Sequence, residues 1–96
     1  MKSYNNSTGR KLVTLADTIK VMEDLDQSYG ENINRKGWHG FASRHEILGI
    51  LIGEMKEFSD EVHRGNINEL LYGELRDIAL AAVHGMASIK SGTLDW

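Results

Sequence analysis

The chain lacks two residue types that can stabilise or stiffen a small protein independently of its packed core, cysteine and proline. Its 96 residues contain no cysteine and no proline. The absence of cysteine excludes disulfides and thiolate-bound zinc as supports for the modest core that a chain of this length can bury. Long hydrophobic runs are also missing. The longest, residues 47–52, is already interrupted by Gly49, so no segment is expected to span a bilayer. Packed helices, oligomerisation or a bound metal remain as supports.

The eleven lysine and arginine residues are scattered along the chain rather than clustered. The formal net charge is −3, and eight of the fourteen acidic residues lie between positions 46 and 77. This local density of negative charge disfavours a nucleic-acid backbone as a partner. The first residues also lack the apolar stretch of a signal peptide. The sequence therefore predicts a soluble, cytoplasmic protein with neither a membrane nor a nucleic acid as partner.

Apolar residues recur at intervals of three and four in three stretches, and no apolar–polar alternation typical of strands persists. This pattern predicts a single all-α domain over residues 1–96, with residues 1–10 flexible. Helices are expected over residues 12–28, 44–63 and 67–89. The candidate core positions are Leu12, Leu15, Ile19, Met22, Leu25, Ile47, Leu48, Leu51, Ile52, Met55, Phe58, Val62, Ile67, Leu70, Leu71, Leu75, Ile78, Ala82 and Ile89.

Local signals predict where these helices begin and end. Ser43 followed by Glu46 is a capping box, and Asn66 begins a similar pattern before the third helix. Gly30 and the polar residues after it are expected to end the first helix and open a loop over residues 29–42. The turn between the second and third helices is very short, which predicts a long antiparallel hairpin. Because its apolar faces are wide for so small a core, we expect a helical bundle completed as a homodimer or homotetramer.

Two pairs of acidic residues are the most informative feature of the chain. Glu54 and Glu57 lie three positions apart on the second helix, and Glu74 and Asp77 on the third. Residues at this spacing share one helix face. Like charges so placed destabilise a helix by about 0.2–0.5 kcal/mol per pair. The pairs also border the apolar stripes, so packing of the hairpin partly removes them from water, and a cation or hydrogen-bond donor becomes necessary.

The geometry of the hairpin brings the two pairs to the same level. Each pair lies about two helical turns from the connecting turn. Helices that pack about 8–10 Å apart allow carboxylates from both sides to meet around one ion. Hard oxygen ligands select Mg²⁺, with Mn²⁺ as the alternative. The sequence thus predicts a magnesium centre whose ligands are Glu54, Glu57, Glu74 and Asp77.

The same residues resemble a known motif. The segment from Leu51 to Phe58, followed by residues 60–66 and 74–78, is similar to the MazG-like all-α nucleoside triphosphate pyrophosphohydrolases, whose signature is E-E-x-x-E, a spacer, then E-x-x-D. The resemblance covers residues 43–90. The first glutamate of the family motif falls on Gly53, whereas the four ligand positions are filled.

This resemblance implies Mg²⁺-dependent hydrolysis of a nucleoside triphosphate to a nucleoside monophosphate and pyrophosphate. It also implies assembly of helical hairpins into dimers or tetramers. The four carboxylates would be the metal ligands. Glu54 is the candidate catalytic residue that orients the attacking water, an assignment that the sequence leaves open.

Four further residues are candidates for substrate binding. Lys36 could meet a phosphate and Trp38 could stack on a base, although Trp38 and Phe41 could equally close the end of a small core. His84 lies seven residues after Asp77 and hence on nearly the same face. It is a candidate substrate contact or simply a packed residue. Lys90 could reach a phosphate from a neighbouring subunit or balance the helix dipole.

Other functions compete with hydrolysis. A non-catalytic helical adaptor, with the acidic residues on its solvated rim, would also explain Gly53 in the motif. A di-iron bundle usually needs Glu-x-x-His on two helices, and only Asp60 with His63 comes near that pattern. A helix-turn-helix DNA-binding protein is disfavoured because no basic recognition helix is present.

Overall fold

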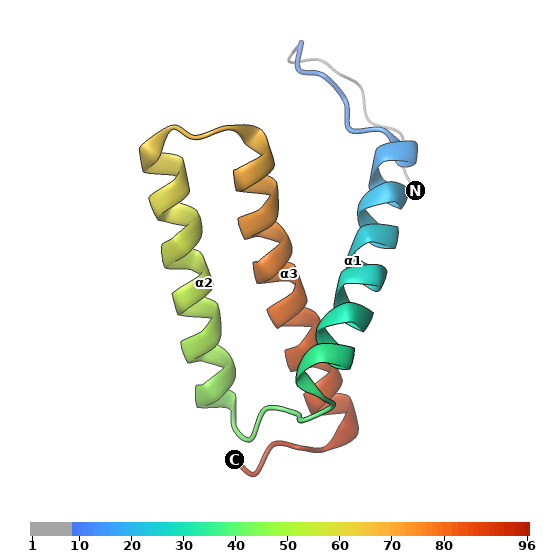
Figure 1. Ribbon diagram of the computed structural model, residues 1–96, viewed down its shortest axis with the longest axis vertical. Helices are drawn as coiled ribbons and strands as arrows, with labels where there is room; N and C mark the ends of the chain where they lie inside the picture. The colour runs from blue at the N-terminus through green and yellow to red at the C-terminus, as the bar shows by residue number, and fades with distance from the viewer. Residues whose placement is uncertain (1–8) are drawn as a thin grey trace.

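The computed structural model describes residues 9–96, which form three helices and no strand (Figure 1). They are α1 (Leu15–Lys36), α2 (Arg44–Arg64) and α3 (Asn68–Ser91). Helix α3 is central, because α2 and α1 each pack against it. The all-α prediction and the antiparallel hairpin of α2 and α3 are confirmed. Apart from positions 9 and 10, the expected flexibility of residues 1–10 lies outside the described part of the chain.

Helix α1 is displaced from the predicted range. It begins at Leu15 because the hydroxyl oxygen of Thr14 accepts a hydrogen bond from the backbone of Asp17 at 3.1 Å. It then continues through Gly30 and stops at Gly37, whose φ of 92° favours glycine. A glycine inside a helix costs about 0.5–1 kcal/mol relative to alanine, and the packing of the following turns offsets this. The predicted range 12–28 and the predicted loop 29–42 are therefore wrong, and the loop spans residues 37–43.

The start of α2 matches its capping prediction, whereas the start of α3 does not. The hydroxyl of Ser43 accepts from the backbone of Glu46 at 3.1 Å, and the Glu46 carboxylate accepts from the backbone of Ala42 at 2.7 Å. Helix α3 has Ile67 at its N-cap, with no side-chain hydrogen bond. The side chain of Asn66 instead donates to Glu61 at the end of α2, so the predicted Asn66 cap is wrong.

The buried apolar core is small. Among the described residues only Ile33 and Leu80 are buried hydrophobic side chains, at 6% and 8% exposure. Helices α2 and α3 approach closely at Gly85, where an added Cβ would lie 3.3 Å from Ile47. Most of the expected core positions are exposed in the single chain. These are Leu12, Leu15, Ile19, Met22, Leu48, Ile52, Met55, Val62, Ile67, Leu70, Leu75 and Ile89.

A polar contact joins the middle of α1 to α3. The hydroxyl of Tyr72 donates to the carboxylate of Asp24 at 2.6 Å, and Arg76 forms an ion pair with the same carboxylate at 3.5 Å. The hydrogen bond from Tyr72 is the main cause that lowers the pKa of Asp24. Toward its N-terminus α1 diverges from α3 (Figure 1), so this contact and the turns after it determine how α1 is held.

The C-terminal segment fixes the loop between α1 and α2. Two backbone hydrogen bonds connect them, from Asp95 to the oxygen of Ala42 at 2.6 Å and from Arg44 to the oxygen of Trp96 at 3.0 Å. The hydroxyl of Thr93 also donates to the oxygen of Phe41 at 2.6 Å. At Gly40 an added Cβ would lie 2.5 Å from Thr93, so this close approach requires glycine. The loop position therefore depends on residues about fifty positions away in sequence.

No described helix is both long and apolar enough to cross a membrane.

Candidate functional site

The structure brings together the four carboxylates that the sequence singled out. Glu54 and Glu57 on α2 and Glu74 and Asp77 on α3 each offer an oxygen, and these oxygens all lie within 4.8 Å of one another. The two pairs meet because the short turn after α2 sets both arms of the hairpin at the same level. We call these four residues the carboxylate cluster. The cluster could bind a metal ion.

Two oxygen atoms of the cluster are buried and lack a hydrogen-bond donor that would replace water. Glu54 Oε2 and Glu74 Oε2 are buried and have no hydrogen-bond partner. Burial is the largest cause that raises the pKa of Glu54, followed by the negative charges of Glu57, Asp77 and Glu74. Burial, and then Glu57 and Asp77, likewise raise the pKa of Glu74. A bound cation would remove both penalties, since it pairs with the buried oxygens and offsets the repulsion.

The raised pKa values predict an unusual dependence of stability on pH. Above the ordinary carboxyl pKa of 4.5, the folded protein retains protons that the unfolded chain has released. Stability then falls as pH rises through this window. In chelator, we expect Glu54→Gln to raise the melting temperature more at pH 7 than at pH 4.5. Thermal melts of both proteins at the two pH values test this, and an equal gain at both would contradict it.

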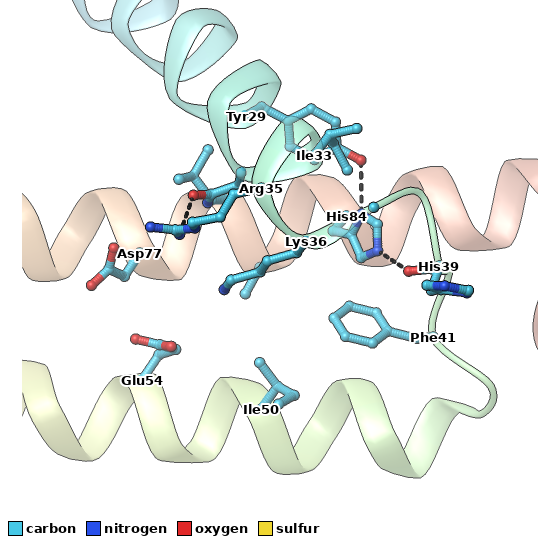
Figure 2. A pocket seen from close by; sticks show the side chains of 14 residues that line it. Tyr29, Ile33, Arg35, Lys36, His39, Phe41, Ile50, Glu54, Asp77 and His84 are labelled. Atoms are coloured by element: carbon cyan, nitrogen blue, oxygen red, sulfur yellow. Dashed lines mark hydrogen bonds between the residues drawn. The ribbon is translucent and has the colours of Figure 1, made fainter.

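Two of the four cluster residues lie at one end of an open pocket of about 590 Å³. Glu54 and Asp77 line this end, and Arg35 and Lys36 extend toward it from the last turn of α1 (Figure 2). Arg35 donates to the side chain of Asn32 at 2.9 Å. Neither cation forms an ion pair with another described residue. The pocket therefore places free positive charge beside the carboxylates, an arrangement that suits a polyanion bound together with a metal ion.

The other end of the pocket is aromatic. His84 of α3 lies 2.7 Å from the hydroxyl of Tyr29 through Nδ1 and 2.8 Å from the backbone oxygen of His39 through Nε2 (Figure 2). The ring of Phe41 meets the His84 ring edge to face, with centroids 4.9 Å apart. This end can receive a planar group at one side while a charged group occupies the carboxylate end.

The structure divides the four candidate substrate residues. Lys36 and His84 line the pocket, and His84 is in addition packed between α1 and the loop. Trp38 does not line it and is 78% exposed, so it does not close a core, whereas Phe41 does line the pocket. Lys90 is exposed in the last turn of α3, thirteen positions or roughly 20 Å along the helix from Asp77, and does not line the pocket.

Tyr29 and Arg35 are among the pocket residues that the sequence does not identify as site residues. Both were assigned to a loop because Gly30 was interpreted as the end of the first helix. The available signal was the spacing of Leu25, Tyr29 and Ile33, which continues the apolar stripe of α1 across the glycine at intervals of four.

Gly53, where the resembling motif has glutamate, is compatible with a side chain. It lies on the exposed side of α2, and an added Cβ would have no heavy atom within 4 Å. We expect Gly53→Ala to stabilise the protein by about 0.5–1 kcal/mol, because glycine loses more backbone entropy than alanine in a helix. Chemical denaturation measures this, and Gly85→Ala is a matched contrast that should not stabilise, since Ile47 occupies the adjacent space.

Comparisons with models of protein families, with curated proteins and with solved structures find no match in any of the three. The fold and the site by themselves define an all-α protein with a carboxylate cluster that could bind a metal ion.

Proposed function

We propose that this protein is a Mg²⁺-dependent nucleoside triphosphate pyrophosphohydrolase, which forms a nucleoside monophosphate and pyrophosphate. One observation carries the proposal: four carboxylates from both arms of a hairpin converge within 4.8 Å, and two of their residues line a pocket. The similarity of these segments to the MazG-like pyrophosphohydrolases agrees with it.

The residues of the cluster fit a hard divalent cation. All four donors are carboxylates, the ligand type that Mg²⁺ and Mn²⁺ prefer. The buried oxygens of Glu54 and Glu74 have no protein partner, and a partner is what a ligated ion would provide. Glu57 and Asp77 would complete the protein ligands. No cysteine or histidine belongs to this cluster, so a soft-metal or zinc site is a poorer fit.

The pocket also fits the charge distribution of a metal-bound triphosphate. A triphosphate cannot approach four carboxylates without cations. Arg35 and Lys36 form no ion pair with another described residue. They stand on the α1 wall, facing the α2 and α3 walls that carry Glu54 and Asp77 (Figure 2). Phosphate oxygens held between that wall and the cluster would leave the nucleoside at the end of the pocket formed by Phe41 and His84.

The chain would contribute positioning, charge and a proton acceptor to the reaction. When bound, Mg²⁺ supplies neutralisation of phosphate charge and lowers the pKa of a water molecule. Arg35 and Lys36 would hold phosphate oxygens and offset charge that develops on the leaving pyrophosphate. Glu54 would orient the attacking water and accept its proton at a carboxylate oxygen.

The direct test is product analysis with a panel of nucleoside triphosphates. We expect pyrophosphate and nucleoside monophosphate in the presence of Mg²⁺, and no turnover in chelator. Release of inorganic phosphate with a nucleoside diphosphate would show a different reaction. No turnover with any of the common ribo- and deoxyribonucleoside triphosphates would reject the proposal.

A non-catalytic adaptor remains the second candidate, because so many large apolar side chains are exposed. The two functions differ in their response to ligands. An enzyme of the proposed kind should be stabilised by Mg²⁺ together with a nonhydrolysable nucleotide, since ligands that bind only the folded state raise its stability. An adaptor should show no such increase in melting temperature.

The exposed apolar residues of the hairpin support assembly with a second copy of the chain. Leu48, Ile52, Met55 and Val62 are 50–60% exposed and lie roughly 80–160° around α2 from Glu54. On α3, Leu75, Met86 and Ile89 are 49–69% exposed and lie roughly 120–180° from Asp77. The hairpin thus has a pocket face and an opposite apolar face, which we call the back face. Because the single-chain core is so small, pairing of two back faces would supply the missing burial.

A further inference from the structure

His84 is hydrogen-bonded at both of its ring nitrogens, and in the neutral imidazole this determines which nitrogen carries the proton. Nε2 lies 2.8 Å from the backbone oxygen of His39. A carbonyl oxygen only accepts, so Nε2 must carry a proton. In the neutral imidazole Nδ1 is then an acceptor, and it lies 2.7 Å from the hydroxyl oxygen of Tyr29. The Tyr29 hydroxyl therefore donates to His84, which in turn donates to His39.

Because its proton is donated to His84, the Tyr29 hydroxyl can only accept a hydrogen bond from a ligand. A tyrosine hydroxyl has a single proton, and here that proton is engaged by His84. The oxygen retains only lone pairs for any further hydrogen bond, and both residues line the pocket. A donor group beside Tyr29 can form a hydrogen bond, whereas a carbonyl or phosphate oxygen would face another acceptor.

We propose that Tyr29 is a specificity-determining residue, whose hydroxyl oxygen accepts a hydrogen bond from the exocyclic amino group of a nucleobase. This inference rests on the proposed nucleotide-binding function. If phosphates occupy the carboxylate end, the base lies between Tyr29, Phe41 and His84. Cytosine and adenine carry an amino group that projects beyond the ring. Uracil and hypoxanthine carry a carbonyl oxygen at that position, so they should bind more weakly.

The ring N–H of uracil does not replace the amino group. It is a donor, but it lies between two carbonyl oxygens. Bringing it to Tyr29 therefore moves one of those oxygens toward the same lone pairs. The geometry accordingly favours a projecting donor.

The test is calorimetric binding of two nonhydrolysable analogues, α,β-imido dCTP and α,β-imido dUTP, in the presence of Mg²⁺. We expect the cytosine analogue to bind about tenfold more tightly, near the upper range for one hydrogen bond. Tyr29→Phe should bring the two affinities together, chiefly by weakening the cytosine analogue. Tyr72→Phe is the matched control: it removes a hydroxyl bonded to Asp24 outside the pocket and should preserve the preference. A merely structural role of Tyr29 would weaken both analogues equally.

A second variant tests the direction of the hydrogen bonds. His84→Phe keeps an aromatic ring but removes the acceptor, which frees the Tyr29 proton to donate. We expect the uracil analogue to gain relative to the cytosine analogue. Equal affinities in the wild type, no binding of either analogue, or an unchanged ratio in Tyr29→Phe would each overturn the proposal.

Parallel hydrolysis assays separate this inference from the proposed activity. Preferential binding of the cytosine analogue without pyrophosphate release from dCTP would reject the enzyme while supporting the role of Tyr29. Pyrophosphate release at equal kcat/KM from dCTP and dUTP would support the enzyme and reject the role of Tyr29.

Discussion

Replacing Glu57 with glutamine, or Asp77 with asparagine, is expected to reduce pyrophosphate release by on the order of 100-fold or more, because even outer-shell residues of metal sites typically contribute 10–100-fold. Each variant keeps nearly the same shape and removes one of the four negative charges that converge within 4.8 Å. Both residues are exposed, so the fold should tolerate the change. Steady-state assays in saturating Mg²⁺ measure the loss of activity. Thermal melts with and without Mg²⁺ measure the loss of stabilisation by the metal.

The control for this pair is Asp60→Asn, a neutralisation on the same exposed side of α2 but outside the carboxylate cluster. It should retain both activity and stabilisation by Mg²⁺. Wild-type turnover in Glu57→Gln and in Asp77→Asn would exclude the carboxylate cluster as the reaction centre. Loss of activity with undiminished Mg²⁺ stabilisation would place the metal elsewhere.

Replacing Ile52 with glutamate is expected to convert the proposed dimer or tetramer into monomers. Ile52 is 60% exposed in the single chain and lies within the back face. A charge there would be buried against apolar side chains of the second copy, which is strongly unfavourable. We also expect the melting temperature to fall by more than about 10 °C, because the folded state loses a stabilising partner. Sedimentation should show wild-type particles of at least twice the 10.8 kDa chain mass.

Ile19→Glu distinguishes the back face from other exposed apolar surfaces. Ile19 lies on α1 and is 48% exposed, so the substitution removes a similar side chain from a different helix. It should leave the assembly intact. Dissociation caused by Ile19→Glu but not by Ile52→Glu would assign the interface to α1. A monomeric wild-type protein would contradict assembly altogether.

The parts of the site that could be predicted are those determined by short-range sequence. Ser43 and Glu46 lie three residues apart, so the capping box that begins α2 follows from local chemistry alone. The distances from Glu57 and Glu74 to the connecting turn are also local. Once the hairpin is recognised, helix geometry requires the two acidic pairs to face each other. Spacing alone does not reveal how far each oxygen is buried, which depends on the packing around Glu54 and Glu74.

The parts that could not be predicted depend on tertiary contacts. Gly30 has a low helix propensity, and the sequence around it is polar, so the local signal favours termination. The bond of Tyr29 to His84 and the burial of Ile33 stabilise the helix beyond that point, and neither contact is visible in a local window. Asn66 shows the converse, because its side chain has a competing partner in Glu61 and does not cap α3.

The apolar pattern predicted the helices. It did not predict whether their apolar faces pack inside the chain or against another molecule. Leu48, Met55 and Leu75 repeat at helical spacing, which is equally typical of a core and of an intermolecular surface. In the single chain they are exposed. Trp38 is a similar case, since an aromatic residue near a predicted helix end does not indicate which way the loop turns.

The attachment of the C-terminal segment to the loop has a consequence for the order in which the site forms during folding. The carboxylate cluster belongs to a hairpin with a short connection, which can close early because little chain entropy is lost. Phe41 is held by Ser88 and Thr93, about fifty positions away, and closing so long a loop is slower. A refolding chain should therefore assemble its carboxylate cluster before it completes the end of the pocket that Phe41 lines.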